Sequence, residues 1–496
     1  MTNARDLPYD VQAHINGEWI TGTNRLPNTN PATGAVLGTY PKLGRDETLA
    51  AIEAAQAAFP AWRQTPAPKR AAILFKAVRL FDERRDGIAE ALTLEEGKTL
   101  ADAKGEVQKS YNILEFIAGE GRRINGETVP SELPHTLAYT VREPLGVVGL
   151  ITPWNFPVAI PVWKIAPALV TGNTVVFKPA SLTPWTAELV TRVFVDAGLP
   201  PGVLNLVTGG GAEVGDTIVR DPRVKALSFT GSNEIGSRLY HDGSERGAKV
   251  QCEMGGKNPL VVLEDADIEL AAIATAQGAF GSTGQRCTAT SRAIVVDAVA
   301  DAFVERVVAL AKEVVIGDGM DDATTMGPVV DAHQLESVLS FMEIGKAEGA
   351  KLLCGGGQLD QGEHAQGFFV APTVFDHVKP DMRIAKEEIF GPVLSVIRVK
   401  DLEEAIDVAN DVDYGLTSSI YSRDVNRVFK FLDRIETGIT HVNSPTMGGE
   451  AQLPFGGVKA TGVGHREMGK TAIEFYSELK TVYVDFTGEA RTSKVY

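Results

Sequence analysis

One cysteine of this chain stands in a sequence setting that suits a nucleophile. Cys287 follows the small, loop-forming residues Gly-Ser-Thr-Gly at 281–284, and a predicted helix ends near Phe280. A reactive thiol needs such exposure together with a neighbour that shifts its proton, and Arg286 in sequence and Glu253 in space are candidates. Because a lone cysteine in a glycine-rich loop is more often inert, other residues must supply an oxyanion site, a base and an electron acceptor.

Two further residues are candidates for the oxyanion site and the base. The stretch Thr-Pro-Trp-Asn-Phe-Pro at 152–157 follows a predicted strand, and the amide of Asn155 can donate a hydrogen bond to a developing oxyanion. Alternatively, Asn155 only caps the next helix. Glu253 precedes Met-Gly-Gly at 254–256, where the glycines allow its carboxylate to rotate into a base position. The alternative for Glu253 is a solvated surface carboxylate.

Groups that bind phosphate or ribose follow other predicted strands. Lys178 lies in Phe-Lys-Pro-Ala-Ser at 177–181, and glycines follow strands at 209–211 and at 231, where a helix begins. In Glu-Glu-Ile-Phe-Gly-Pro at 387–392, a carboxylate suits ribose hydroxyls and the phenylalanine can line a flat heterocycle. Neither glycine stretch fits the ordinary dinucleotide fingerprint. The alternatives are a solvated surface lysine for Lys178 and a helix end with a core phenylalanine for 387–392, and glycine loops alone are weak signals.

Strands and helices alternate around these motifs. The pattern predicts strands and helices in turn beyond Pro144, and a second such series from about 259 to 442. This alternation indicates βαβ units, so we expect an α/β fold with two consecutive parallel-sheet domains. The first series comprises strands at 146–152, 174–178, 203–207 and 224–229 and helices at 158–171, 183–197, 212–220 and 233–241.

The flanking regions predict simpler elements. Residues 11–40 read as short strands, and helices are expected at 46–59, 69–85 and 100–118. Residues 137–142 alternate like an exposed ribbon, which needs a partner to cover its edges. The strand expected at 479–486 would pair with that ribbon or with a neighbouring subunit.

Composition limits the class of protein. A chain of 496 residues, 44% hydrophobic and 23% charged, is typical of an enzyme with two or three domains. No window is apolar enough to span a membrane, and residues 1–19 do not resemble a signal peptide. A chain of this length with three cysteines is predicted to lack a disulfide framework and to be cytoplasmic. The spacing of the cysteines is not that of a metal site. A net charge of −16 disfavours nucleic acid or an anionic membrane as partner.

The order and spacing of the motifs resemble the NAD(P)-dependent aldehyde dehydrogenase superfamily over nearly the whole chain. The resemblance implies an aldehyde dehydrogenase-like fold with two Rossmann-like domains and a β-ribbon for oligomerisation. We expect the cofactor domain at 1–123 and 145–255, the catalytic domain at 256–460, and the ribbon and tail at 124–144 and 479–496. The matching motifs are TPWNFP at 152–157, FKPAS at 177–181, FTGS at 229–232, EMGGK at 253–257, GQRC at 284–287, EEIFGP at 387–392 and LPFGG at 453–457.

The resemblance also implies roles for individual residues. Cys287 would be the nucleophile and Glu253 the general base, with Lys164 close to that glutamate. Asn155 and the Cys287 backbone N–H would form the oxyanion hole. No metal is expected. The expected substrate residues are Phe156, Trp163 and Arg286, and the expected cofactor residues are Thr152, Pro153, Trp154, Lys178, Ser181, Gly211, Gly231, Ser232, Gly255, Glu388 and Phe390.

The expected reaction oxidises an aldehyde to a carboxylic acid through a cysteine thioester, and Glu253 favours a free acid over an acyl-coenzyme A product. The runs 150–181 and 452–469 resemble the branch that oxidises 2,5-dioxopentanoate (α-ketoglutarate semialdehyde). Arg286, beside the nucleophile, would bind an acidic substrate. Trp163 stands where succinate semialdehyde dehydrogenases typically carry arginine. The alternatives are a succinate semialdehyde or broad-specificity dehydrogenase, a reductase that uses an acyl donor, and a non-catalytic relative, which typically lacks the cysteine or the glutamate.

Ser181 bears on the choice of cofactor. NAD-selective members of the family often carry a glutamate three residues after the lysine that matches Lys178, and this chain has serine there. Serine would not repel a 2′-phosphate, so we expect NADP to be preferred and NAD to remain usable. The alternative is that Ser181 only caps the helix expected near Thr183. We expect a homodimer or a homotetramer.

Overall fold

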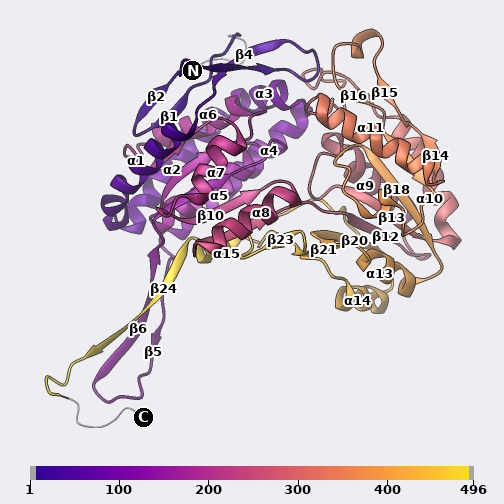
Figure 1. Cartoon of the computed structure of the whole chain (residues 1–496). Coiled ribbons are helices and arrows are strands. Elements are labelled where there is room, and N and C mark those ends of the chain that lie inside the picture. Colours follow the sequence, from indigo (N-terminus) through magenta and orange to yellow (C-terminus); the bar gives the residue numbers. More distant parts are fainter. Residues whose placement is uncertain (1–6, 491–496) are drawn as a thin grey trace.

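The computed structural model describes residues 7–490, in which two large sheets and a long arm form the framework (Figure 1). The first sheet has the order β2-β1-β9-β8-β7-β10-β11-β23. From β9 to β11 the neighbouring strands are parallel, whereas β1, β2 and β23 pair antiparallel at the two edges. Its strands are β1 (Ala13–Ile15), β2 (Glu18–Ile20), β7 (Val147–Ile151), β8 (Thr174–Lys178), β9 (Leu204–Leu206), β10 (Val224–Thr230), β11 (Lys249–Glu253) and β23 (Gly462–Val463).

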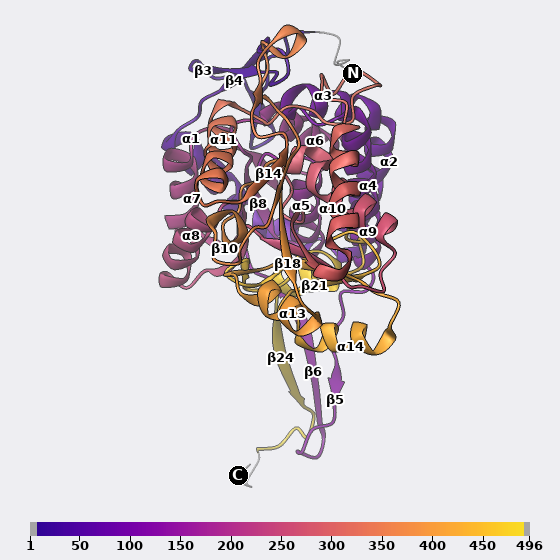
Figure 2. The same ribbon diagram turned by 90° about the vertical axis from the view of Figure 1, so that its right-hand side faces the viewer.

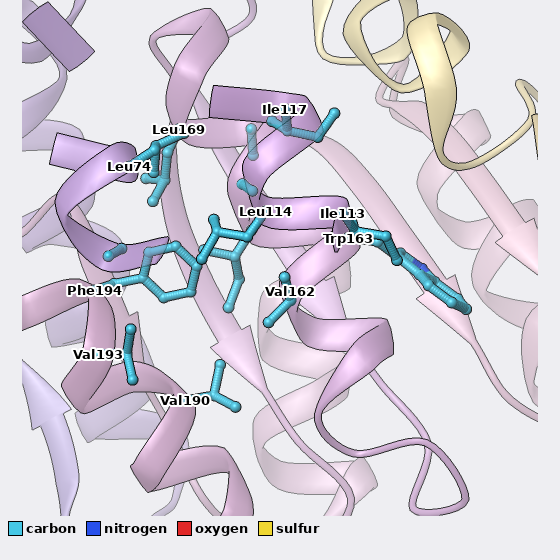
Figure 3. Packing of buried hydrophobic residues seen from close by; sticks show 14 of the residues in the cluster. Leu74, Ile113, Leu114, Ile117, Val162, Trp163, Leu169, Val190, Val193 and Phe194 are labelled. Carbon is cyan, nitrogen blue, oxygen red and sulfur yellow. The ribbon is translucent and has the colours of Figure 1, made fainter. Parts of the chain in front are cut away.

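Helices cover both faces of this sheet. Successive strand residues point to opposite faces, so Val147 and Val176 join one core cluster and Val148 and Val175 the other. Every residue of α5 is buried, as expected for a helix that is apolar on all sides. Figure 3 shows its Val162 and Leu169 among side chains of neighbouring helices. The covering helices are α1 (Arg45–Gln64), α7 (Asp216–Arg220) and α8 (Asn233–Glu245) on one face, and α2 (Ala67–Glu83), α4 (Leu100–Glu120), α5 (Ala159–Thr171) and α6 (Pro184–Asp196) on the other.

The second sheet has the order β14-β17-β18-β13-β12-β20-β21, and only β14 runs antiparallel to its neighbour. It also has a buried core on each face, so the expected α/β class with two mostly parallel sheets is confirmed. The strands are β12 (Asn258–Val262), β13 (Thr290–Val296), β14 (Lys351–Cys354), β17 (Thr373–Asp376), β18 (Val393–Val399), β20 (Thr417–Tyr421) and β21 (Ile439–Val442). The helices packed on it are α9 (Ile268–Phe280), α10 (Asp297–Lys312), α11 (Ala332–Ala347), α12 (Arg383–Lys386), α13 (Leu402–Asn410) and α14 (Val425–Arg434).

The arm projects from the body of the molecule in both views (Figures 1 and 2). It consists of β5 (Thr128–Val129), β6 (Thr136–Pro144) and β24 (Ser477–Asp485). Strand β24 pairs antiparallel with β6 along its whole length, which confirms that the tail strand covers an edge of the ribbon. Leu479, Tyr483 and Phe486 are nevertheless exposed. Residues 1–6 and 491–496, at the outer ends of the expected cofactor domain and tail, lie outside the described residues.

Two segments differ from the sequence expectation. The helix expected at 69–85 ends at Glu83, and a separate helix, α3 (Arg85–Glu96), follows it directly. Gly87 weakens the helical pattern there, but burial of Ile88 and Leu92 stabilises the helix. The expected helix at 212–220 begins as a π-helical turn, Gly211–Gly215, before α7.

The end of the chain returns to the first sheet. Strand β23 pairs with β11, and α15 (Gly469–Phe475) buries Ile473 and Phe475 in the core beside α5. No helix in residues 7–490 is long and apolar enough to cross a membrane. The remaining short strands are β3 (Arg25–Thr29), β4 (Val36–Pro41), β15 (Gln358–Leu359), β16 (Phe369–Val370), β19 (Tyr414–Gly415) and β22 (Val458–Lys459).

Candidate active site

Most of the candidate residues follow the carboxyl ends of parallel strands in the first sheet. Residues 152–157 follow β7, Lys178 ends β8, Gly231 follows β10 and Gly255 follows β11. Because these strands are parallel neighbours, their carboxyl ends share one edge of the sheet. The strand order reverses between β7 and β10, and ligands of open α/β sheets bind at such a point.

The loop before Cys287 has an unusual backbone. Helix α9 ends at Phe280, as expected, and Ser282 (φ 48°), Thr283 (φ 58°) and Gly284 (φ 67°) are all in the left-handed region. This region disfavours serine and threonine, so tertiary contacts must stabilise the loop. A Cβ at position 284 would lie 2.2 Å from the Gly391 carbonyl oxygen, so only glycine fits there.

The Cys287 thiol is half-buried and faces a crowded, acidic environment. Its backbone oxygen accepts a hydrogen bond of 2.7 Å from the Asn258 side-chain amide, which helps to fix the loop. Burial, together with the carboxylates of Glu388 and Glu253, raises the pKa of the Cys287 thiol to about 12, although Lys109 opposes this shift. The resting thiol is therefore protonated at neutral pH.

Asn155 is buried beside the Cys287 loop. Its side-chain amide donates a hydrogen bond of 3.0 Å to the Gln285 carbonyl oxygen, which leaves a second amide hydrogen for another acceptor. The N-cap of α5 is Val158, which makes no side-chain cap bond, so the alternative role of Asn155 as the helix cap is wrong. Val158 occupies the cap position of the helix, and the Asn155 amide is therefore free of that role.

A buried ion pair fixes the backbone of Asn155. The Lys98 ammonium donates 2.7 Å hydrogen bonds to the Asn155 carbonyl oxygen and to the Glu106 carboxylate. Glu106 in turn accepts hydrogen bonds from the N–H groups of residues 158 and 159, at the start of α5. Sequence reasoning missed Lys98, in the loop between α3 and α4, and Glu106 on α4, since charged residues in loops and helices normally face solvent.

Glu253 lies in a buried acidic pocket. Its Oε2 has no hydrogen-bond partner within the described chain, and a Cβ on Gly456 would lie 2.2 Å from its Oε1. Burial, followed by the Glu467 carboxylate, raises the Glu253 pKa well above its usual value, while Arg466 and Lys164 lower it. Gly456 of the LPFGG motif thus leaves room for this carboxylate.

Lys164 connects this pocket to Glu467. Its ammonium forms an ion pair with Glu467 and donates a 2.7 Å hydrogen bond to the Ser228 hydroxyl. Lys164 and Glu467 are both buried, and the charge of Lys164 lowers the Glu253 pKa although no ion pair joins these two residues within the described chain. Glu467 was not predicted as a site residue, although it lies within the 452–469 run.

The second sheet contributes a carboxylate to the cofactor side. Glu388, shortly before β18, accepts a 2.8 Å hydrogen bond from the Gly256 N–H, and burial raises its pKa to about 7. A Cβ on Gly255 would lie 2.1 Å from Glu388 Oε2, so the missing side chain allows this approach. Phe390 has φ 56° and contacts Trp154 edge to face, with ring centroids 5.4 Å apart.

Lys178 and the start of α8 complement this carboxylate. The buried Lys178 ammonium donates a 3.0 Å hydrogen bond to the Pro179 carbonyl oxygen and has no ion pair within residues 7–490. Burial lowers its pKa to about 8, so an approaching anion would be favourable. Ser232 is the N-cap of α8 and makes no side-chain cap bond, which leaves first-turn N–H groups for a phosphate. These residues fit a dinucleotide with ribose hydroxyls and a pyrophosphate.

The remaining expected cofactor residues surround this edge. Ser181 donates a 3.2 Å hydrogen bond to the Gly209 carbonyl oxygen, and the N-cap of α6 is Thr183. The alternative role of Ser181 as the helix cap is therefore wrong. Gly211 begins the π-helical turn after β9, and the Thr152 hydroxyl, just before Pro153, is buried without a hydrogen-bond partner within residues 7–490.

A cavity of about 820 Å³ opens on the other side of Cys287. Phe156, Trp163 and Arg286 line it, as expected for substrate residues. Arg286 Nη2, however, lies 2.7 Å from the Asp102 carboxylate, so its charge is balanced. Within residues 7–490, no cluster of three or more histidine, cysteine or acidic side chains could hold a metal ion. The cavity walls that were not predicted include Lys109, Phe116, Ile160 and Phe455.

Comparison with known proteins places this geometry in a family. The model of the aldehyde dehydrogenase family matches residues 19–482. A 2,5-dioxopentanoate dehydrogenase from Saccharolobus solfataricus is 48% identical over 471 residues, which cover 94% of this chain and 98% of the relative. An alpha-ketoglutaric semialdehyde dehydrogenase from Bacillus subtilis is 45% identical over 473 residues, which cover 95% of this chain and 97% of the relative.

Solved structures agree in fold. A crystal structure of an NADP-dependent enzyme from E. coli has a TM-score of 0.93 and 40% identity, covering 97% of this chain and 99% of that one. Betaine aldehyde dehydrogenase from Staphylococcus aureus, in complex with NAD⁺, has a TM-score of 0.96 and 34% identity, covering 99% of both chains. With matches of this extent, the chain belongs to the aldehyde dehydrogenase family and is an NAD(P)-dependent oxidoreductase.

Proposed function

We propose that this enzyme oxidises 2,5-dioxopentanoate to 2-oxoglutarate through a thioester on Cys287. One observation carries the assignment of the nucleophile: the Cys287 thiol lines the 820 Å³ cavity, and the amide of Asn155 binds the loop that holds it. The names of the two relatives at 45% and 48% identity support the substrate. The cofactor is NAD or NADP, as in the family.

In the first step the Cys287 thiol loses its proton to solvent water, and its sulfur forms a bond with the aldehyde carbon while the carbonyl π bond breaks. The carbonyl oxygen becomes an oxyanion, which the second amide hydrogen of Asn155 and the Cys287 N–H stabilise. Neither group needs to move far, because the loop and Asn155 are already bound to each other. Covalent attachment separates oxidation from hydrolysis.

The nicotinamide cofactor, held by Lys178, Ser232 and Glu388, would supply the acceptor for the hydride of the substrate carbon. Cys287 then holds the acyl group as a thioester, and Glu253 removes a proton from the water that attacks it. The raised pKa of Glu253 makes its carboxylate a stronger base than an exposed glutamate. Hydrolysis returns the free thiol and releases the carboxylic acid.

Lys178, Ser181, Ser232 and Glu388 would hold the cofactor. Glu388 would accept hydrogen bonds from ribose hydroxyls, and the start of α8 would bind the pyrophosphate. Lys178 ends β8, and Ser181 follows it three residues later. The segment 178–181 has no carboxylate that would repel the 2′-phosphate of NADP. This arrangement favours NADP while NAD remains usable.

The alternatives account for fewer observations. A non-catalytic relative would have no need for a thiol, an amide and a buried carboxylate around one site. A succinate semialdehyde dehydrogenase remains the second candidate for the substrate, since Lys109 supplies a cation to the cavity although position 163 is tryptophan.

The arm supports a role in oligomerisation. Exposed apolar side chains along it, among them Leu137, Leu479 and Tyr483, would be covered by another subunit of a homodimer or homotetramer. We keep the domain division at 1–123 with 145–255, 256–460, and 124–144 with 479–496. Because β23 and α15 return to the first sheet, we also propose that residues 461–476 belong to the cofactor domain. The three free cysteines suit a cytoplasmic location.

A panel of aldehydes with both cofactors, followed by nicotinamide absorbance, tests the function. The enzyme should prefer 2,5-dioxopentanoate, and Cys287→Ala should abolish oxidation while cofactor binding survives. Strong preference for a simple aliphatic or aromatic aldehyde would reject the substrate. Activity near wild type in Cys287→Ala would reject the thioester mechanism.

A further inference from the structure

Lys109 supplies a cation to the Cys287 cavity, and no ion pair within residues 7–490 balances its charge. It lies on α4 and is half-buried, with its ammonium 5.3 Å from the ring centroid of Trp163 and 5.6 Å from that of Phe455. Within the described chain it forms no ion pair and no hydrogen bond with a protein acceptor. Two aromatic faces attract the charge, but they replace only part of its hydration.

Arg286, the other cation that lines this cavity, is already paired with a carboxylate. Its guanidinium donates 2.7 Å hydrogen bonds to the Asp102 carboxylate and to the Ser282 hydroxyl. Its charge is therefore already balanced, and binding a substrate anion would require a new arrangement of this ion pair. The sequence suggested Arg286 as the anion-binding residue, but the structure favours Lys109.

The acidic side chains that line the cavity do not balance the positive charge of Lys109. Glu106 already accepts hydrogen bonds from Lys98 and from two N–H groups of α5. Asp102 pairs with Arg286, and Glu115 and Glu450 are exposed and make no ion pair with Lys109. Burial lowers the pKa of Lys109, although Cys287 and Glu106 oppose that shift. A carboxylate bound beside the ammonium would also oppose that lowering.

A glycine keeps the ammonium accessible. A Cβ at Gly449 would lie 3.6 Å from Lys109 Nζ and 3.5 Å from Phe455 Cδ2, so any longer side chain there would crowd the ammonium. Gly449 lines the same cavity as Cys287. The space beside Lys109 is thus continuous with the space at the thiol.

We propose that Lys109 binds the carboxylate of the substrate and so selects aldehydes that carry an anionic group away from the reacting carbon. The assignment rests on the proposed role of Cys287 as the nucleophile of this cavity. The ammonium would form a charge-assisted hydrogen bond with the carboxylate, in a site shielded by Trp163 and Phe455. Lys109 is therefore a specificity-determining residue and takes no part in bond formation.

The test compares Lys109→Met and Lys109→Arg with wild type on 2,5-dioxopentanoate and on pentanal, a neutral aldehyde of equal length. In Lys109→Met, the ratio of kcat/KM for the anionic to the neutral substrate should fall roughly 10- to 100-fold, mainly through KM. Lys109→Arg should restore most of the ratio. Lys104→Met, an exposed lysine on the same helix, is the matched control and should leave the ratio unchanged.

Equal losses on both substrates, or an unchanged ratio, would overturn the assignment. Binding of 2-oxoglutarate, measured by calorimetry without turnover, separates it from the proposed function. Its affinity should fall by a similar factor in Lys109→Met and not in Lys104→Met. If wild type prefers pentanal but still binds 2-oxoglutarate through Lys109, the proposed substrate is wrong and the Lys109 assignment stands.

Discussion

The Lys98 ammonium donates a 2.7 Å hydrogen bond to the backbone carbonyl oxygen of Asn155. The same ammonium pairs with the buried Glu106 carboxylate, which binds the first N–H groups of α5. The proposed oxyanion donor is therefore fixed from both sides, by Lys98 at its backbone and by Gln285 at its amide. Pre-organised donors stabilise an oxyanion more strongly than donors that must reorient.

Lys98→Met should lower kcat with a smaller effect on KM, because the Asn155 amide remains but loses its support. Asn155→Ala sets the upper limit, a loss of roughly 10²–10³ in kcat, since it removes one oxyanion donor. Lys98→Met should also lower the melting temperature, because Glu106 is left buried without its partner. Steady-state kinetics and thermal melting, with Lys104→Met as control, measure both effects. An unchanged kcat in Lys98→Met would show that the contact does not support catalysis.

Glu253→Gln should release a single burst of reduced cofactor and then stall. Oxidation precedes the step that needs the base, so the acyl-enzyme accumulates. Stopped-flow absorbance should show about one equivalent of reduced cofactor per active site, and intact mass spectrometry should show the acyl adduct. Unchanged steady-state turnover would place the base elsewhere. Glu467→Gln is an informative comparison, since Glu467 raises the Glu253 pKa and pairs with Lys164.

Alkylation of Cys287 in the cofactor-free enzyme should be slow at neutral pH. Its thiol pKa is raised to about 12, and the reactive form is the thiolate. The rate with iodoacetamide should therefore increase about tenfold per pH unit from neutral to mildly alkaline pH. Peptide mass spectrometry distinguishes this site from Cys252 and Cys354. A plateau near neutral pH would mean that the thiol pKa is close to neutral.

Ser181→Glu should lower kcat/KM for NADP far more than for NAD, by roughly 100-fold, because like charges would then face each other. Ser181→Ala is the matched control, since it removes the 3.2 Å hydrogen bond to Gly209 without adding charge. Measurement of both cofactors at saturating aldehyde gives the ratio. A wild-type enzyme that is strictly NAD-specific would contradict this view of Ser181.

The family, the α/β class and the motifs of the site follow from the amino-acid sequence alone. The alternation of strands and helices can be predicted from the sequence, because each type of element buries apolar residues at its own characteristic spacing. The sequence allowed two partners for the tail strand, the ribbon or a neighbouring subunit, and the structure pairs β24 with β6 of the ribbon. Helix α3 was missed because its stability comes from the tertiary burial of Ile88 and Leu92, which local propensity does not record.

Which charged side chains meet at the site depends on how the folded chain packs. Arg286 is next to Cys287 in sequence, yet it pairs with Asp102. Lys109, 178 residues away from Cys287, lines the same cavity and has no ion pair in the described part of the chain. Glu467 reaches Lys164 for the same reason, because the end of the chain returns to the first sheet. Charge pairing depends on distances of a few ångströms across the packed core, and sequence spacing does not specify those distances.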